Sequence, residues 1–324
     1  MNPPLITHNS IFITHNSKLI NKMIQKKILT IMQCGRKVTS EEIEIIKETV
    51  NLFNRLSRKE LAETICEHLQ WYTASGTNKA EACLKLLEKL EDKGLIELPQ
   101  KKTLKPRKAS SAVSFTERTD PRPEIYGTLK DIGKVKLEIV DDKESKSLWI
   151  EYMSRYHYLG YYKPFGFYMY YFIKSDNNIL GCILFSGPSK SMGIRDKWIG
   201  WTNDQRSRNQ AWIANNSRFL IFPWVHVRYM ASHVLGLIIK NIEQDWEDKW
   251  GYRPALLETF VDPKLYKGTC YKASNWICLG MTTGEGLVRK GKTYTTSPKV
   301  LFVYPLAKNF REILCKEKLV GRVF

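Results

Sequence analysis

The segment MYYFIKSDNNILGCILF, residues 169–185, predicts the centre of the fold. Its two flanks, Met169–Ile173 and Ile179–Phe185, are rich in aromatic and β-branched side chains, which favour strands. Between them stands Asp176-Asn-Asn178, and both Asp and Asn favour tight turns. The segment is therefore expected to form a β-hairpin.

Strand and helix patterns continue on both sides of this hairpin. Upstream, alternating Val135, Leu137 and Ile139 predict a strand, and residues 142–155 predict a helix. Downstream, the expected elements are a buried strand Phe219–Val225, a long helix over residues 230–249 ending near Gly251, a strand Ala255–Val261, a short helix Tyr266–Asn275, a strand Trp276–Gly280 and a strand Val300–Tyr304 that closes the sheet. This order predicts an α/β (α+β) domain with a mixed sheet over residues 131–324.

Residues 40–99 show three successive helical patterns. The second opens on the capping box Ser57-Arg-Lys-Glu60, and the third is expected to be capped by Asn78 and to end at Gly94. A short strand is expected at Leu95–Leu98. The expected inward side chains are Ile43, Ile46, Val50 and Phe53, then Leu61, Ile65 and Leu69, then Cys83, Leu86, Leu87 and Leu90.

Three helices followed by a strand are typical of a winged helix-turn-helix, whose third helix enters the major groove. A three-helix module that docks protein is the alternative. A basic linker over residues 100–130 follows, and its flexible composition suits phosphate contacts. The expected DNA-binding residues are Arg58, Lys79, Lys85, Lys89, Lys101, Lys102, Lys105, Arg107 and Lys108. Residues 1–39 are expected to be a polar tail, and Met23 is an alternative start.

The charge balance favours a nucleic-acid partner. Lys and Arg total 51 against 33 Asp and Glu, a net charge of +18, and phosphate backbones are the usual partners of such an excess. No apolar run approaches a membrane span, and no signal peptide is evident. The seven scattered cysteines lack a CxxC pair, which argues against zinc fingers and disulfides and favours a reducing cytoplasm. We therefore expect no metal and no membrane partner.

Several polar and aromatic strings stand at the ends of the expected elements of residues 131–324. They are Tyr156-His-Tyr-Leu-Gly160, Asp196-Lys-Trp-Ile-Gly-Trp201, Asn215-Asn-Ser-Arg-Phe-Leu-Ile-Phe-Pro223, Ala231-Ser-His-Val-Leu-Gly236, Leu257-Glu-Thr-Phe-Val-Asp262 and Gly268-Thr-Cys-Tyr-Lys-Ala-Ser-Asn-Trp276. Together they resemble the DruA family of the Druantia anti-phage system, from about residue 40 to the end. The resemblance implies a bacterial defence or mobile-element role on DNA, beside helicase, transposase or other defence-system partners.

The element order over residues 135–304 also resembles the GNAT acyltransferase fold, and the motif residues resemble phage Mom-type DNA modification proteins. That likeness makes His157, Tyr158, Arg218 and Asp262 catalytic candidates. Acyltransferases bind the pyrophosphate of coenzyme A on a glycine-rich turn at a helix N-terminus. Here the matching stretch is Arg228-Tyr-Met-Ala-Ser-His233, without glycine, so ordinary use of acetyl-CoA is doubtful and the cofactor is unknown.

Each candidate has a chemical role and a structural alternative. His157 and Tyr158 suit proton transfer or base stacking, or belong to an aromatic belt. Arg218 and Asp262 would position a substrate at strand ends, or form a structural ion pair. Tyr271 would serve as an acid at a leaving group, or pack in the core.

Substrate-binding candidates complete the expected site. Asn215 and Asn216 would contact a base or ribose, or simply make a turn. Ser232 and His233 start the long helix, which Ser232 would cap. In addition, Trp198, Trp201, Trp212 and Trp224 with Arg195, Arg206 and Arg208 predict a stacking surface, a buried core or some of each.

Three hypotheses follow for the function. The first is a DNA-modifying transferase of the GNAT-like kind, and the second a non-catalytic DNA-recognition module that recruits a helicase or transposase. The third is a metal-dependent nuclease that uses Glu258, Asp262 and His157.

Overall fold

The computed structural model describes residues 30–54, 56–100, 113–176, 178–284, 297–317 and 319. The chain divides into two compact units, which we call the helical unit (Met1–Trp71 and Asn78–Lys102) and the sheet unit (Tyr72–Thr77 and Thr103–Phe324). The expected polar tail up to residue 29, the linker lysines and arginines of residues 101–108, and Met23 lie outside the described residues.

The helical unit begins with a hairpin of β1 (Ile31–Gln33) and β2 (Arg36–Val38), followed by α2 (Ser40–Leu52), α3 (Arg58–His68) and α4 (Ala80–Asp92). Capping boxes fix the first turns of two helices: Thr39 with Glu42 at α2, and Ser57 with Glu60 at α3. The apolar stripes of the three helices meet in one core, which confirms the three expected helices.

Four details of the helical unit differ from prediction. The β1–β2 hairpin lies within the expected tail. Leu95–Leu98 is no strand, because the Leu98 amide donates to the Glu91 carboxylate rather than to a neighbouring strand. The N-cap of α4 is Lys79, and the Asn78 side chain donates to Glu63 and Glu67 on α3 instead. Phe53 ends α2 with 43% of its surface exposed. The described hairpin thus precedes the three helices, whereas the expected winged helix-turn-helix has its strand after the third helix.

The sheet unit is built on seven strands in the order β10-β11-β9-β7-β6-β5-β4. Their bounds are β4 Val135–Ile139, β5 Met169–Ser175, β6 Asn178–Ser186, β7 Ile213–Ile221, β9 Leu256–Val261, β10 Ile277–Met281 and β11 Val300–Pro305. Only β7 and β9 pair in parallel, and the other described neighbours are antiparallel. This arrangement confirms a mixed α/β sheet.

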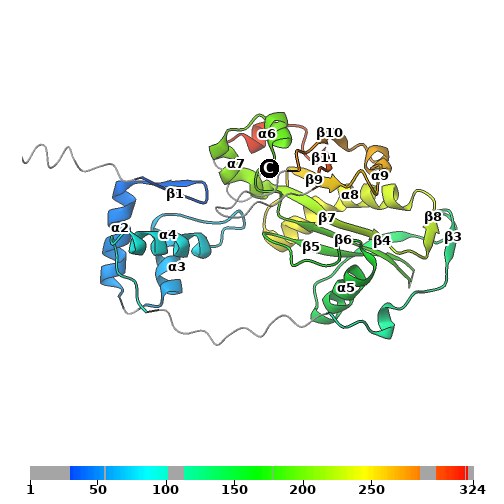
Figure 1. Ribbon diagram of the computed structural model, residues 1–324, viewed down its shortest axis with the longest axis horizontal. Helices are drawn as coiled ribbons and strands as arrows, with labels where there is room; N and C mark the ends of the chain where they lie inside the picture. Colours follow the sequence, from blue (N-terminus) through cyan, green and yellow to red (C-terminus); the bar gives the residue numbers. More distant parts are fainter. Residues whose placement is uncertain are drawn as a thin grey trace, which may run out of the picture. The chain divides into compact units, whose positions relative to one another are not determined.

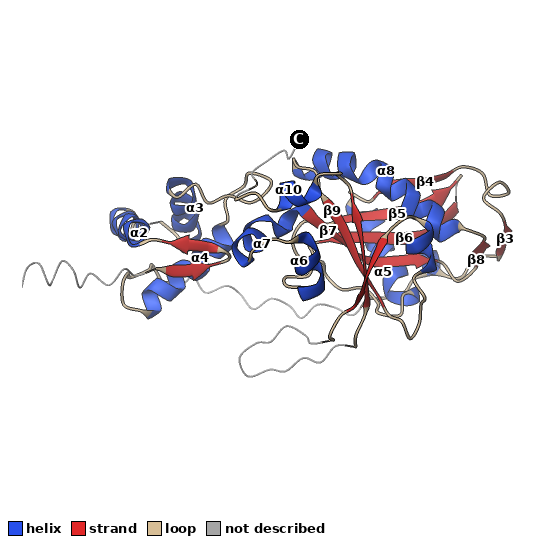
Figure 2. Ribbon diagram, turned by 90° about the horizontal axis from the view of Figure 1, so that it is seen from above, coloured by secondary structure: helices blue, strands red, loops and turns tan. Residues whose placement is uncertain are grey.

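Two long helices cover opposite faces of the sheet (Figures 1 and 2): α5 (Lys143–Tyr156) on one and α8 (Met230–Trp250) on the other. Alternate residues of the central hairpin therefore enter different cores. Tyr170 and Phe172 pack with Trp149 of α5, while Met169 and Tyr171 pack with Ile238 of α8. Burial on both faces explains why β5 and β6 are almost continuously apolar.

Smaller elements surround this framework. They are η1 Glu117–Thr119, β3 Ile125–Gly127, α6 Gly193–Ile199, α7 Asn203–Asn209, η2 Gln210–Trp212, β8 Val225–Val227, α9 Thr269–Ala273 and α10 Phe310–Leu314. Strands β3 and β8 form a short parallel ladder of their own. Gly181 on β6 allows the close approach of β7, since a Cβ there would stand 2.2 Å from the Leu220 carbonyl oxygen.

The expected strand Phe219–Val225 was misplaced. Strand β7 starts at Ile213 and ends at Ile221, before Phe222-Pro223, because proline cannot donate to a ladder. The short helix α9 covers only Thr269–Ala273 of the expected Tyr266–Asn275. Strand β11 lies between β9 and β10, so that β10 and not β11 forms the edge of the sheet.

A buried ion pair joins α6 to β9, an interior strand of the sheet. The Arg195 Nη1 atom donates to Glu258 Oε2 at 2.7 Å, with both side chains fully buried, and Ser189 N donates to Glu258 Oε1 at 2.8 Å. Arg195 also donates to Asp196. This network fixes the chain before α6 against the middle of β9.

We expect Arg195→Leu to destabilise the sheet unit by about 3–5 kcal/mol, because it leaves the Glu258 carboxylate buried without its cation. Chemical denaturation measures the loss. The matched control is Glu144→Gln, which breaks the exposed pair with Arg118 and should cost less than about 1 kcal/mol. Equal effects of the two substitutions would show that the buried pair is not structural.

Candidate functional site

A pocket of about 360 Å³ opens where β7 and β9 separate. The two strands pair only from Ile213 to Asn216 on β7 and from Leu256 to Thr259 on β9. Directly after Asn216, the register between β6 and β7 shifts, so that Ser217 is the extra residue of a β-bulge. The bulge and the end of the ladder leave a gap between neighbouring strands, and α5, α8 and α9 contribute further lining residues.

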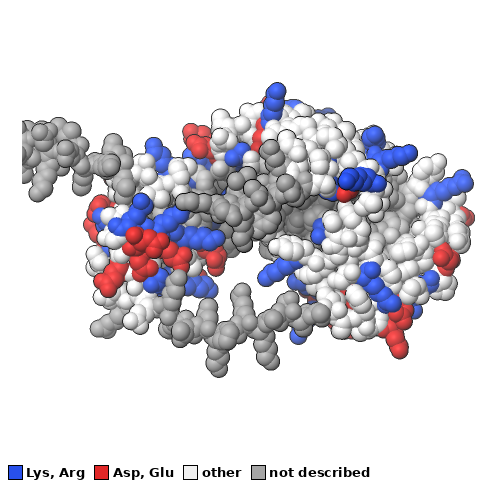
Figure 3. All heavy atoms as spheres, viewed as in Figure 1, with Lys and Arg blue, Asp and Glu red and all other residues white. Residues whose placement is uncertain are grey.

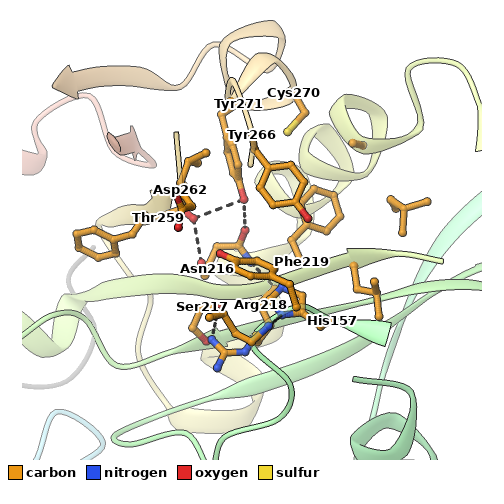
Figure 4. Close-up of a pocket in the computed structure, with 18 of the residues that line it drawn as sticks. His157, Asn216, Ser217, Arg218, Phe219, Thr259, Asp262, Tyr266, Cys270 and Tyr271 are labelled. Atoms are coloured by element: carbon orange, nitrogen blue, oxygen red, sulfur yellow. Dashed lines mark hydrogen bonds between the residues drawn. The ribbon is translucent and has the colours of Figure 1, made fainter. Parts of the chain in front are cut away.

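The floor of the pocket is a hydrogen-bonded set of three buried side chains (Figure 4). The Tyr271 hydroxyl donates to Asn216 Oδ1 at 2.7 Å, and Thr259 Oγ1 donates to the Asn216 carbonyl oxygen at 3.0 Å. Asn216 Nδ2 donates to the carbonyl oxygens of Leu184 and Arg218. Because the amide of Asn216 is fully engaged inside the protein, it holds the bulge in shape and is not available to contact a base or ribose.

Tyr271 projects from the short helix α9 onto this floor. Its ring packs between Phe302, at 5.7 Å between ring centroids, and Trp276, at 5.1 Å. Gly268 begins α9 with a φ of +67°, and a Cβ there would stand 2.7 Å from the Phe302 ring. Burial raises the pKa of Tyr271, so its hydroxyl stays protonated at neutral pH. It is therefore a donor and not a base.

Arg218 lies on the β7 wall of the pocket, in the middle of the strand rather than at its start. Its Nε donates to the Gly160 carbonyl oxygen at 2.8 Å, and its Nη1 donates to the Ser217 carbonyl oxygen at 2.7 Å. No described residue accepts a hydrogen bond from its Nη2. Burial lowers the pKa of Arg218, yet a guanidinium remains charged at neutral pH. Arg218 is thus a fixed cation with one nitrogen left for a ligand.

His157 ends α5 and faces the same pocket. Its Nδ1 accepts from the Leu159 amide at 3.2 Å, which places the proton of the neutral ring on Nε2. Burial and then the charge of Arg218 lower the pKa of His157 to about 4. At neutral pH the imidazole is therefore uncharged and donates from Nε2, so its geometry favours hydrogen bonding over the proton transfer that we expected.

Asp262 follows β9 on the opposite wall and forms an ion pair with Lys299, which precedes β11. The hydrogen bond from Lys299 and the Lys264 amide lower the pKa of Asp262. Sequence analysis did not identify Lys299 as a partner, and Arg218 was the partner expected for Asp262. The carboxylate stays ionised and partly neutralised, which makes it a weak general base.

Two tyrosines stand at the mouth. Tyr158 from the loop after α5 and Tyr266 from the loop after β9 lie 5.8 Å apart between ring centroids. Both are about half exposed, at 46% and 54%. Burial and the nearby Asp262 raise the pKa of Tyr158. Tyr266 was not among our candidates, although it stands four residues after Asp262 in the sequence.

The structure gathers most of the expected site. His157, Tyr158, Arg218, Asp262, Tyr271 and Asn216 all line one pocket. Asn215 does not line it, and its buried Oδ1 has no hydrogen-bond partner among the described residues. Ser232 and His233 line a separate shallow groove beside α8. Ser232 is not the helix cap, because its hydroxyl donates to the Tyr229 carbonyl oxygen within the first turn.

The first turn of α8 does not fit coenzyme A as acyltransferases bind it. The glycine positions hold Ala231 and His233, whose side chains stand beside the amides that a pyrophosphate would approach. Tyr229, the N-cap of α8, has a φ of 61° and is 79% exposed. The residues of this turn therefore do not fit this cofactor.

The expected nuclease residues are also not assembled. Glu258 is buried and paired with Arg195. It does not line the pocket to which His157 and Asp262 contribute. Among the described residues, no group of three or more His, Cys, Asp or Glu side chains is placed to hold a metal ion. The nuclease hypothesis thus lacks the available carboxylate that it required.

The tryptophans form mainly core. Trp201, Trp212 and Trp224 are at most 8% exposed, and Arg195 is fully buried. Trp198 stacks on Phe310, and the guanidinium of Arg311 lies against both rings. Arg206 donates to Asp196 and Arg208 to the Glu317 carbonyl oxygen. The interpretation as a buried core was correct for these three tryptophans, and the stacking surface that we predicted was wrong for them.

The expected DNA-binding residues of the helical unit are partly engaged in its structure. Arg58 forms two hydrogen bonds to Glu91, at 3.0 and 3.1 Å, and Lys89 donates to Gln33. Lys85 is exposed on α4, and Lys79 precedes that helix. Residues 40–99 contain eight Lys and Arg but twelve Asp and Glu. Figure 3 accordingly shows basic and acidic side chains side by side over this unit, so the positive excess lies elsewhere in the chain.

The strand order, the parallel pair and the pocket between its strands define a mixed α/β protein. Similar solved structures include an aminoglycoside acetyltransferase in complex with coenzyme A (12% identity, 55% of this chain and 98% of that chain, TM-score 0.34). Another is the ribosomal-protein-S18-alanine N-acetyltransferase from Escherichia coli, with 8% identity over 54% of this chain and 95% of that chain and a TM-score of 0.33. A third is an N-acetyltransferase from Staphylococcus aureus Mu50, with 8% identity over 54% of this chain and 99% of that chain and a TM-score of 0.32. No curated protein matches the chain.

Residues 89–296 match the family described as Druantia protein DruA. This match spans more than half of the chain, which therefore belongs to the DruA family. The expected resemblance is confirmed over this range, although it was expected to begin near residue 40. No helix in the described part of the chain is long and apolar enough to cross a membrane.

We expect Tyr271→Phe to destabilise the protein by about 1–3 kcal/mol, because the buried Asn216 Oδ1 loses its donor. Denaturant unfolding monitors the change. Tyr266→Phe, which alters an exposed tyrosine at the same pocket, is the control and should leave stability within about 0.5 kcal/mol of the wild type. A neutral Tyr271→Phe would show that the floor network contributes nothing.

The lowered pKa of His157 predicts a pH dependence of stability. Between about pH 6.5 and 4 the unfolded chain binds a proton that the folded imidazole does not, so stability falls as the pH falls. The wild type should lose roughly 1 kcal/mol per pH unit in this window relative to His157→Gln. Parallel pH profiles of the two proteins in urea denaturation would contradict the burial of a neutral histidine.

Proposed function

We propose that this DruA-family protein is a DNA-directed component of the Druantia anti-phage system and that the pocket of its sheet unit recognises a nucleotide. The observation that carries this proposal is the composition of the pocket: a fixed cation, Arg218, with an available nitrogen, below the aromatic rings of Tyr158 and Tyr266. Phosphates and base edges are acceptors for such a guanidinium, and aromatic rings stack on bases.

The distribution of charge supports a DNA partner for the linker and the sheet unit. The chain carries +18, yet residues 40–99 are acidic on balance. Residues 100–108 contribute Lys101, Lys102, Lys105, Arg107 and Lys108 without any acidic residue. The helical unit then serves as a docking module for protein, such as a helicase or another subunit of the defence system, while phosphate contacts come from the rest of the chain.

The residues of the pocket suit recognition of a nucleotide better than they suit acid–base catalysis. His157 is neutral at physiological pH, Tyr271 stays protonated, and Asp262 is paired with Lys299. A general acid or base works best with a pKa near the operating pH, and these three groups are shifted away from it. The misfit between the first turn of α8 and coenzyme A points in the same direction.

A transferase that modifies a base is the second candidate. It is favoured by Tyr271, a protonated hydroxyl on the pocket floor below the bulge at Ser217, which would suit a proton donor to a leaving group. Mass analysis of nucleosides from DNA incubated with the protein and a cell extract separates the two candidates. We expect unchanged nucleosides, whereas a new nucleoside that disappears with Tyr271→Phe would establish the transferase.

The location of the phosphate contacts is testable with two matched double variants. Lys102→Ala with Lys105→Ala should weaken DNA binding and lower the slope of log affinity against log salt by up to about 2, because each lost phosphate contact removes about 0.9. Lys79→Ala with Lys85→Ala should change affinity little. Fluorescence anisotropy at several salt concentrations measures both, and the reverse order of effects would assign DNA binding to the helical unit.

A further inference from the structure

A cluster of exposed apolar and aromatic side chains stands at the mouth of the pocket. Tyr158 and Leu159, in the loop after α5, and Tyr266, in the loop after β9, line the pocket, and Leu265 directly precedes Tyr266. These four residues, which we call the aromatic rim, are between 46% and 54% exposed. Clustered exposed side chains of this kind mark binding surfaces more often than isolated ones do.

Both loops of the rim are held by hydrogen bonds to the pocket walls. The amides of Leu265 and Tyr266 donate to the Asp262 carbonyl oxygen, at 3.1 and 2.8 Å. On the other side, the Gly160 amide donates to His157, and the Gly160 carbonyl oxygen accepts from Arg218. The rings are therefore presented from fixed positions, which lowers the entropy cost of binding a ligand to them.

The rings form a series across the mouth. His157 and Tyr158 lie 4.8 Å apart between centroids at 30°, and Tyr158 and Tyr266 lie 5.8 Å apart at 56°. Planar rings exposed in this way stack on the faces of nucleobases, largely without regard to sequence. In duplex DNA those faces are hidden against neighbouring base pairs, so stacking requires a base that has left the duplex.

Cations accompany the rings. Arg218 and Lys267 line the pocket, and Lys264 is exposed in the same loop as Tyr266. The carboxylate among the lining residues belongs to Asp262, which Lys299 neutralises. A positive surface interleaved with exposed aromatic rings is complementary to an unpaired nucleic-acid strand, whereas an apolar protein partner would gain nothing from these lysines.

Resting on the proposed function, we infer that the aromatic rim binds an unpaired nucleotide, with the base against Tyr158 and Tyr266 and its phosphate beside Lys264 and Lys267. The form of DNA that the sheet unit takes is then single-stranded or locally opened DNA. Arg218 Nη2 reaches the acceptor-rich group that enters the pocket below the rings. Duplex DNA is bound only through phosphate contacts and leaves the rim empty.

The test compares a labelled oligodeoxynucleotide with the blunt duplex of the same sequence by fluorescence anisotropy, using the full chain. Tyr158→Ala and Tyr266→Ala should each weaken single-strand binding about 5- to 100-fold, the range that loss of one stacked base produces. Duplex binding should change less than about twofold. Tyr158→Phe, which keeps the ring, should bind like the wild type.

Tyr126→Ala is the matched control, because Tyr126 is an exposed tyrosine on β3 that stacks on His226 and does not line the pocket. It should leave both affinities unchanged. If the rim variants fold, as judged by their melting temperatures, and bind single strands as well as the control does, the inference is overturned while DNA binding stands. If the wild type binds neither form of DNA, the proposed function itself fails.

Discussion

The site depends on a parallel ladder that stops early. Strands β7 and β9 pair over four residues each, and the bulge at Ser217 then turns β7 away from its partner. Had the ladder continued, the β7 backbone beyond Asn216 would be hydrogen-bonded to β9 and the gap between the two strands would be closed. The separation exposes the β7 wall, the Asp262 end of β9 and the floor between them, and Tyr271 closes that floor through its bond to Asn216. One break in hydrogen bonding thus creates the cavity and sets the positions of its lining groups.

The lining groups explain why we favour recognition. Burial keeps His157 uncharged and Tyr271 protonated, while Lys299 keeps Asp262 ionised, so each group holds one protonation state near neutral pH. Fixed donors and a fixed cation bind acceptor-rich ligands without transferring protons. The proposed recognition of a nucleotide rests on these fixed protonation states.

Local patterns predicted much of this structure. Alternation located β4, runs of aromatic and β-branched residues located β5 and β6, and the capping box at Ser57 located α3, because these signals lie within a few residues. Six of the expected site residues met in one pocket. Long-range pairings carried no such signal: Lys299 stands 37 residues from Asp262, and Arg195 stands 63 from Glu258. The acidic balance of residues 40–99 was visible in the sequence, and counting it would have moved the expected DNA contacts away from the helices.

The most direct measurement is an experimental structure of the full chain with a short single-stranded oligonucleotide. The account predicts one nucleotide at the separation of β7 and β9, its base against Tyr158 or Tyr266 and an acceptor atom within hydrogen-bonding distance of Arg218 Nη2. Nucleic acid bound only to the helical unit, with the pocket unchanged, would contradict the claim that the break in the β7–β9 ladder made a nucleotide site.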